Sequence, residues 1–596
     1  MTQALNAVLD ALEAGQPAAA RAAADAALAQ YPDDAQLWSV AGLAARLCGD
    51  AERAVHCWQR SASLQPTAAG CNRLGELLAT LGRPAEALAC YATAVQQGVA
   101  DAITWGNLGL LHMQAGEPAA AEAAYHQALA LAPEHLRTRV NLGVLLAGLR
   151  RHDEAEQAYR TALAQSPDDA AAHTNLGLLL EETRRIAEAE QHQRRALALA
   201  PCTAQIHNHL AGVLARQPGK EAEAETHYRE AARLQPTDPV PHSNLGALYF
   251  DLGRTAEAEA SLRAALALQP DFASARLNLG QLLLSLGRLQ EGWPHVELRY
   301  TLRVPGALPG FPAHTATPRW AGEPLQGKRL LVWPEQGHGD QIQFCRYLAI
   351  VRAQQQTAQL SFACSEPLLE LLRGVHGPDQ VIALADAPAA LATHDYWVPL
   401  LSLPLFCGTT LDNIPSHTPY LQANPARSAH WARRLDAALP PRSAGPRIGL
   451  VWRGNAWHDN DADRSLPGLA TLAPLWQLPG ASFVSLQKIA GEDEARQPPT
   501  DQPLLHLGGE IQSFADTAAL LQQLDLLVSV DTAAAHLAGA LGRPCCVLLP
   551  AYRNDWRWLR SRTDSPWYPQ MRLFQQETRG DWGGVVQRVV GQIAGF

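Results

Sequence analysis

The chain has 596 residues, more than one hydrophobic core usually covers, so we expect at least two domains. Hydrophobic residues make up 47% of the sequence and charged residues 18%, a balance typical of globular rather than disordered chains. The formal net charge is −10, and no Lys or Arg cluster stands out. Nucleic acid is therefore not expected as a partner, because neutralising phosphates needs grouped cations.

The sequence shows no targeting or metal-binding signal. Its start lacks the basic stretch and the apolar core of a signal peptide, and no apolar run reaches about 18 residues, the length that a membrane-spanning helix needs. The 10 cysteines are scattered without CxxC pairs or Cys/His spacing. We interpret them as reduced thiols and expect a cytoplasmic protein with no membrane span and no metal.

The first 300 residues repeat with a period of 34. Asn-Leu-Gly recurs at 107–109, 141–143, 175–177, 244–246 and 278–280, and the first three spacings are 34, 34 and 69 residues. The longest spacing is two units plus one residue, which fits the Gln-Pro-Gly at 217–219. A helix–turn–helix unit of this length resembles the tetratricopeptide repeat. We predict an all-α solenoid over residues 1–300, with about eight repeats and a partial one.

An asparagine precedes each Leu-Gly pair and forms a column at the solenoid period: Asn107, Asn141, Asn175, Asn244 and Asn278. Asn both donates and accepts hydrogen bonds, so such a column could hold the backbone of an extended peptide without reading its sequence. The column resembles the asparagine ladder of the eukaryotic O-GlcNAc transferase solenoid, which implies that it binds an acceptor polypeptide. Simple tolerance of Asn at a solvated helix position is the other interpretation, and both stay open.

The period ends at residue 300, and the second half alternates short apolar runs with helical stretches, as in a parallel α/β fold. Residues 301–327, rich in Pro, Gly and Thr, predict an irregular connector whose Trp and Phe contact the next domain. The predicted strands are 329–333, 360–364, 381–383, 396–400, 448–452, 483–486, 524–530 and 546–549. A Pro-rich segment splits them into two Rossmann-like lobes, 328–425 and 447–596, with an interlobe linker at 426–446. Ligands are expected in the cleft at the strand ends.

Three loops at predicted strand ends carry the candidate functional residues. In Gly337-His338-Gly339-Asp340, two glycines before a helix allow close backbone approach to a substrate, although an Asp there also serves as a plain helix cap. The polar loop 452–466 holds Arg453 and Arg464, and long polar loops after strands are often functional. The third loop turns at Asp531 into a small-residue helix, whose free N–H groups suit a diphosphate.

The third loop carries a family resemblance. Asp531-Thr532-Ala533-Ala534-Ala535-His536-Leu537, followed by Leu541-Gly542-Arg543-Pro544, resembles the Asp-Thr-Gly-x-x-His-Leu…Leu-Gly-x-Pro motif of the ADP-heptose lipopolysaccharide heptosyltransferases. Gly337-His338-Gly339-Asp340 is similar to the Gly-Asp loop of their N-terminal lobe. The resemblance implies a family 9 type glycosyltransferase domain of the GT-B fold. Ala533 replaces the usual Gly, and the N-terminal lobe is shorter than in that family. The fused repeats resemble the layout of O-GlcNAc transferase and of flagellin glycosyltransferases.

The resemblance also implies roles for individual residues. Asp340 is the expected general base of an inverting transfer, and His338 is an alternative base or an acceptor contact. The donor diphosphate is expected on N–H groups at the start of the helix, with arginines neutralising the leaving group so that no metal is needed. The donor-site candidates are Arg464, Arg453, Gln487, Lys488, Asp531, Thr532, Ala533 and His536.

We therefore expect a glycosyltransferase that moves a sugar from a nucleotide-sugar donor to a protein held by the repeats. Flagellin or another surface protein is the candidate acceptor, and no cofactor is expected. Two alternatives stay open. One is a glycan or lipopolysaccharide-type transferase whose repeats dock a partner, and the other is a non-catalytic scaffold with a degenerate transferase domain.

Overall fold

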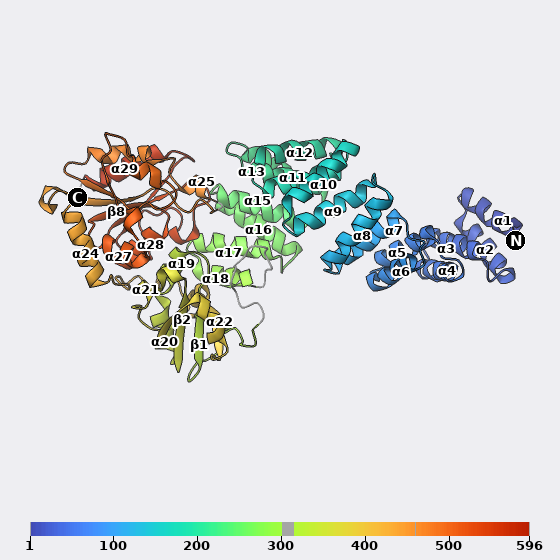
Figure 1. Cartoon of the computed structure of the whole chain (residues 1–596), viewed down its shortest axis with the longest axis horizontal. Helices are drawn as coiled ribbons and strands as arrows, with labels where there is room; N and C mark the ends of the chain where they lie inside the picture. Colours follow the sequence, from blue (N-terminus) through green and yellow to red (C-terminus); the bar gives the residue numbers. More distant parts are fainter. Residues whose placement is uncertain (1, 301–314, 459, 595–596) are drawn as a thin grey trace. The chain divides into compact units, whose positions relative to one another are not determined.

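The computed structural model describes residues 2–300, 315–458 and 460–594 (Figure 1). The chain forms two compact units, residues 1–235 and residues 236–596. No helix within the described ranges combines the length and the apolar character needed to cross a membrane.

The first unit consists of helices that pair along the chain, as the 34-residue period predicts. Turns of a few residues join them, and the predicted insertion at 217–219 lies in the turn between α13 and α14. The helices are α1 (Thr2–Glu13), α2 (Pro17–Gln30), α3 (Ala35–Leu47), α4 (Ala51–Leu64), α5 (Ala68–Thr80), α6 (Pro84–Gln96), α7 (Ala102–Gln114), α8 (Pro118–Leu131), α9 (Leu136–Gly148), α10 (His152–Gln165), α11 (Ala170–Glu182), α12 (Ile186–Leu199), α13 (Ala204–Ala215) and α14 (Glu221–Leu234).

The glycine of each Asn-Leu-Gly lets the two helices of a repeat approach closely. A Cβ placed on Gly109 would lie 2.6 Å from the ring of Tyr125, and one on Gly143 would lie 2.5 Å from the ring of Tyr159. Both tyrosines are buried on the second helix of their repeat. A larger residue at either position would collide with a buried tyrosine ring that has no room to move. The glycine therefore recurs with the repeat because helix packing requires it.

The second unit begins with four more repeat helices: α15 (Pro239–Asp251), α16 (Thr255–Leu268), α17 (Ala273–Ser285) and α18 (Leu289–Val296). Across the described residues, α1 to α16 make eight helix pairs, and α17 with the short α18 makes the partial one. The last two pairs nevertheless belong to the same compact unit as the α/β part.

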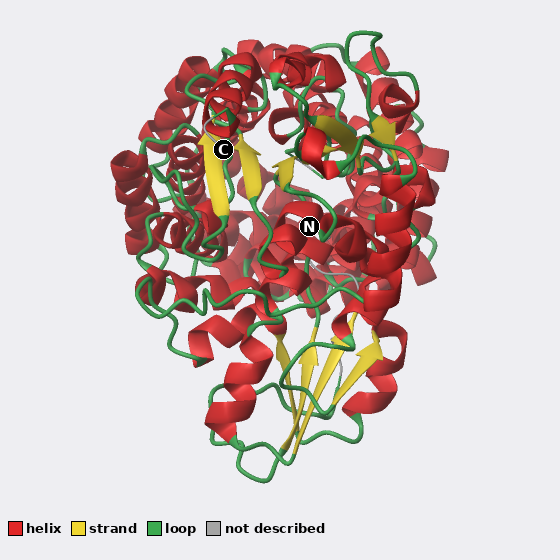
Figure 2. Ribbon diagram, turned by 90° about the vertical axis from the view of Figure 1, so that its left-hand side faces the viewer, coloured by secondary structure: helices red, strands yellow, loops and turns green. Residues whose placement is uncertain are grey.

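Two parallel sheets follow, and Figure 2 shows them as separate groups of strands flanked by helices. The first has the order β3-β2-β1-β4 and the second the order β10-β9-β8-β5-β6-β7. All eight predicted strands are present, and β7 and β10 were not predicted. The strands are β1 (Arg329–Trp333), β2 (Gln359–Cys364), β3 (Gln380–Ala383), β4 (Tyr396–Pro399), β5 (Arg447–Val451), β6 (Ser482–Ser485), β7 (Leu505–His506), β8 (Leu526–Val530), β9 (Cys545–Leu549) and β10 (Met571–Gln575).

Helices connect and flank these strands. The α-helices are α19 (His338–Phe344), α20 (Tyr347–Gln355), α21 (Leu369–Leu372), α22 (Ala387–Leu391), α23 (Leu403–Phe406), α24 (Pro425–Asp436), α25 (Asp461–Arg464), α26 (Glu492–Arg496), α27 (Phe514–Leu521), α28 (Ala533–Ala540) and α29 (Trp582–Ile593). The short 3-10 helices are η1 (Glu297–Tyr300), η2 (Glu366–Leu368), η3 (Leu384–Asp386), η4 (Leu400–Ser402), η5 (Arg442–Ala444), η6 (Leu469–Gln477), η7 (Gly508–Glu510) and η8 (Trp556–Trp558).

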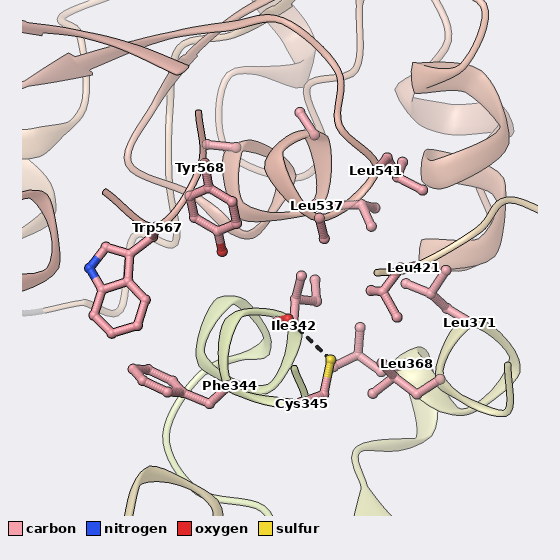
Figure 3. Packing of buried hydrophobic residues seen from close by; sticks show 14 of the residues in the cluster. Ile342, Phe344, Cys345, Leu368, Leu371, Leu421, Leu537, Leu541, Trp567 and Tyr568 are labelled. Carbon is pink, nitrogen blue, oxygen red and sulfur yellow. Dashed lines mark hydrogen bonds between the residues drawn. The ribbon is translucent and has the colours of Figure 1, made fainter. Parts of the chain in front are cut away.

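The two lobes share one buried core where α19 of the first meets α28 of the second. Figure 3 shows Ile342 and Phe344 of α19 facing Leu537 of α28 and Trp567, and all four side chains belong to one buried cluster. The buried Arg346 guanidinium crosses between the lobes and donates to the Trp567 carbonyl at 2.7 Å. The lobes are thus held together by packing and by a buried cation.

The expected linker and connector are more ordered than their composition predicts. Within the predicted linker 426–446, α24 begins after the Asn424 cap and packs on α27 through the buried Trp431, whose indole N–H lies 3.4 Å from Asp516. The prolines around this segment favoured the prediction of a linker, although Trp431 and Leu435 have the four-residue spacing of a buried helix face. In the connector, Trp320 is buried as expected and contacts Phe406, with ring centroids 4.7 Å apart. Residues 301–314, which include the Phe of the prediction, lie outside the described residues.

Candidate functional site

The two loops that carry the family resemblance meet in space. α19 begins after β1, α28 begins after β8, and the first turns of these helices touch. A Cβ on Gly339 would lie 2.8 Å from Cδ2 of His536 and 3.6 Å from Cα of Ala533. Position 339 therefore favours a glycine because the His536 ring leaves no room there for a Cβ. Asp340, the next residue, is brought to the start of α28.

Asp340 is a partly buried carboxylate, with 17% of its side chain exposed, and it is held by two donors. Its Oδ2 accepts the Gly337 N–H at 2.8 Å, and its Oδ1 accepts a hydrogen bond from the Arg557 guanidinium. Arg557 also pairs with both oxygens of Asp555, at 3.0 and 2.9 Å. Burial raises the pKa of the Asp340 carboxyl, and the Arg557 charge offsets only part of that rise. A carboxylate with a raised pKa suits a general base.

Asp531 and His536 lie close enough to Arg557 for its charge to lower the pKa of both groups. The His536 ring stacks on Trp558 at 5.1 Å, its Nδ1 lies 3.1 Å from the Tyr568 hydroxyl, and its Nε2 lies 3.7 Å from Asp531. Burial, assisted by the Arg557 charge, lowers the pKa of His536 to about 3, so the imidazole is neutral. Burial and the neighbouring Asp555 raise the pKa of Asp531 to about 6.

The start of α28 has the features of an anion site that its sequence predicts. Thr532 precedes the first helical residue, Ala533, and the Thr532 hydroxyl pairs with Ser529 at 2.9 Å. The first N–H groups of any helix lack partners within that helix and carry the positive end of its dipole. The Arg464 charge acts on Asp531, two residues before this helix, and opposes the rise in its pKa.

The other predicted donor-site residues are engaged elsewhere. Arg453 bonds Glu494 at 2.8 Å. The buried Gln487 amide is fully used, since its oxygen accepts two backbone N–H groups at 3.0 Å each and its nitrogen donates to two carbonyls at 3.0 and 2.7 Å. The exposed Lys488 donates to the Ile511 carbonyl at 2.6 Å. Gln487 therefore braces the loop after β5, and its role in donor binding stays a prediction.

His338 and the asparagines of the column are all half-buried. The His338 ring lies 5.2 Å from that of Phe514, and burial lowers its pKa. All five asparagines are half-buried on the first helix of their repeats. Asn107 is held in place, because its amide donates to the Tyr91 hydroxyl at 3.2 Å and accepts from Arg137 at 2.8 Å. Peptide binding by the column stays a prediction.

Sequence reasoning missed the residues that join the two loops, above all Arg557 and Asp555. They lie in the run 553–560, Arg-Asn-Asp-Trp-Arg-Trp-Leu-Arg, which follows β9. The signal that could have identified these residues is a dense mixture of Arg, Asp and Trp soon after a buried strand. No group of three or more His, Cys, Asp or Glu side chains in the described part of the chain is arranged to hold a metal ion.

The fold and the site define a helical-repeat protein joined to a two-lobed α/β domain, and the comparisons with known proteins agree. Residues 5–69 and 68–97 match tetratricopeptide repeat profiles, and residues 96–297 match the C-terminal domain of cilia and flagella-associated protein 70. Residues 488–553, which include the start of α28, match glycosyltransferase family 9 (heptosyltransferase). The chain therefore combines tetratricopeptide repeats with a heptosyltransferase-like segment.

Individual relatives cover parts of the chain. Protein FlbA of Caulobacter vibrioides is 30% identical over 333 residues, which are 51% of this chain and 52% of that protein. The chain thus spans about half the length of this curated relative. A tetratricopeptide repeat protein from Parabacteroides merdae is similar at 17% identity and a TM-score of 0.36, over 42% of this chain and 98% of that one. YrrB, described as a TPR protein with an unusual peptide-binding site, is 22% identical with a TM-score of 0.26, over 31% of this chain and 95% of its own.

Proposed function

We propose that this protein is a glycosyltransferase with a GT-B-like domain, which transfers a sugar from a nucleotide-sugar donor to a polypeptide held by the repeats. The observation that supports it is the contact between Gly339, next to Asp340, and the start of α28, since 3.6 Å separates the Cβ position of Gly339 from Cα of Ala533. A carboxylate from one lobe and an anion-binding helix start from the other are the parts that a direct displacement needs.

In this mechanism the donor diphosphate binds at the N–H groups of Thr532 and Ala533. The acceptor nucleophile forms its bond to the anomeric carbon while the bond to the diphosphate breaks, so the configuration inverts. Asp340 takes the proton of the nucleophile. Arg557 does not block this role, because an ionised carboxylate has about four acceptor positions and two are occupied. Arg464 and Arg557 stabilise the leaving diphosphate in place of a metal ion.

One observation favours the non-catalytic scaffold as a second candidate. Three carboxylates, Asp340, Asp531 and Asp555, surround the start of α28, and two guanidinium groups, Arg464 and Arg557, face them. A site with this charge balance attracts a diphosphate less strongly than one lined by cations alone. In that case the domain would bind a neutral or weakly charged group and the repeats alone would carry the function.

Two measurements test the proposed function. Isothermal titration with UDP, ADP, GDP and CMP should show micromolar binding of at least one nucleotide, and binding of none would support the scaffold. Intact-mass analysis of flagellin and other surface proteins co-expressed with the enzyme should show a sugar-sized mass increase that Asp340→Ala abolishes. Asp493→Ala is the matched control, because it removes the same carboxylate from a side chain that is 99% exposed and pairs with Arg496 on the same helix. A mass increase that persists with Asp340→Ala would remove Asp340 from the mechanism.

A further inference from the structure

The segment that holds Asp340, residues 553–560, is strained. We call it the Arg557 loop; it lies between β9 and β10 and contains η8. Arg553 has φ 55°, and Leu559 combines φ 55° with ψ 157°, a backbone region that is essentially restricted to glycine. Non-glycine residues stay in such conformations only where their surroundings force them to. The contacts of the loop therefore show what holds it.

Both ends of the Arg557 loop are attached to the last two repeat helix pairs. The Arg560 N–H donates to the Ser285 carbonyl at the end of α17, at 2.9 Å. The Arg560 guanidinium donates to the Phe250 carbonyl near the end of α15 at 2.6 Å and lies 4.9 Å above the Phe250 ring. At the other end, Arg553 lies 3.6 Å from Asp251, the last residue of α15. The carbonyls at a helix C-terminus lack partners within the helix and favour cations.

The middle of the loop is held from both sides. On the repeat side, the buried Trp293 of α18 meets Trp556 edge to face, with ring centroids 5.4 Å apart. On the opposite side, Arg557 bonds Asp340 and Asp555. Leu559, which is strained, lies between Arg557 and Arg560, so the contacts of Arg560 bear on the geometry of Arg557. The backbone N–H of Arg560 bonds Ser285, and its guanidinium, which Arg560→Ala removes, bonds Phe250.

We infer that α15 and α17 position the Arg557 loop and thereby the base, so that Arg560 and Asp251 are positioning residues that act on Asp340 through Arg557. The last repeats are then part of the active site rather than only a docking arm. They also carry Asn244 and Asn278, seven residues before Asp251 and Ser285. Seven residues are two helical turns, about 10 Å on the same face, so an acceptor bound there would lie on the helices that hold the loop. This inference rests on the proposed function.

The test compares full-length Arg560→Ala with Arg562→Ala as the matched control. Arg562 lies two residues further on and pairs with Asp564 at 2.7 Å, without a repeat contact among those described for it. Hydrogen exchange followed by mass spectrometry should show about tenfold or greater acceleration in residues 553–560 and 336–340 for Arg560→Ala only. This measurement needs no substrate, so it stands even if the proposed function fails.

A second measurement separates positioning from simple folding. The charged groups facing Asp340 are Arg557, Asp555 and Glu335. Displacing Arg557 takes away a cation that lowers the pKa of Asp340, so this pKa rises further. With the donor identified by titration, Arg560→Ala should lower kcat about tenfold to hundredfold and move the acidic limb of the pH profile upward. KM for the donor should change little.

The outcomes are distinct. Unchanged exchange in both segments with Arg560→Ala would overturn the positioning role whatever the activity. Normal exchange and pH profile with lost activity would assign Arg560 a different role. If Arg560→Ala does not fold, Asp251→Asn tests the other end of the loop, where Asp251 pairs with Arg553. We then expect faster hydrogen exchange at Arg553. Exchange as slow as in the wild-type protein would refute the inference. Absence of nucleotide binding by the wild-type protein would refute the proposed function alone.

Discussion

Replacing Gly339 by alanine tests the contact between the lobes most directly. The added Cβ would lie 2.8 Å from Cδ2 of His536, whereas ordinary carbon contacts begin near 3.4 Å. His536 cannot retreat, because it is buried between Trp558, on which it stacks, and Tyr568, which it hydrogen-bonds. α19 would therefore have to move from α28 by about half an ångström or more. Overpacking of this kind costs about 1–3 kcal/mol, against a gain of about 0.5–1 kcal/mol from replacing Gly by Ala in a helix.

We expect Gly339→Ala to lower the free energy of unfolding by about 1–2 kcal/mol and turnover by about tenfold to hundredfold. Urea denaturation followed by tryptophan fluorescence reports on the right part of the chain, because 12 of the 15 tryptophans follow residue 235. Gly509→Ala is the control, since its Cβ would meet nothing closer than 3.4 Å. If Gly339→Ala matched the control in stability and turnover, the close contact would not constrain the site and the reasoning would be wrong.

Four further outcomes follow from the same geometry. Asp340→Asn should lower turnover by about two to four orders of magnitude with donor binding kept, measured by steady-state kinetics and titration. Arg464→Ala should weaken binding of nucleoside diphosphates far more than of nucleosides, and an equal loss of both would contradict a phosphate role. Burial raises the pKa of Asp531 to about 6, above its unfolded value, so its contribution to stability is present at low pH and is lost as pH rises through 6. Asp531→Asn should therefore gain stability relative to wild type between pH 5 and pH 7.5 in urea denaturation. Gly143→Val should destabilise the repeats by about 1–3 kcal/mol through the Tyr159 ring, without changing nucleotide affinity, and unaltered thermal unfolding would contradict it.

The sequence alone determined the features that depend on local spacing. The 34-residue period predicted the helix pairs because every repeat solves the same packing problem, a glycine against a large side chain such as Tyr125 or Tyr159. Buried parallel strands are continuous apolar runs, so eight of them were found, while the two-residue β7 and the partly exposed β10 left no such run. Asp531 was recognisable because it directly follows β8 and opens a short motif, and Asp340 because it ends the Gly-His-Gly-Asp motif in the segment after β1.

Only the tertiary structure decided which groups meet. Arg557 lies 217 residues from Asp340 in sequence, and no local pattern encodes such a pair. The same holds for the attachment of Arg560 to Ser285 and for Gln487, whose amide bonds the backbone that follows the neighbouring strand β5. Periodicity reports which face of an element is buried, whereas the partners on that face depend on how distant elements pack. The repeats and the two lobes could therefore be predicted from the sequence. The contacts between the last repeats and the site could not.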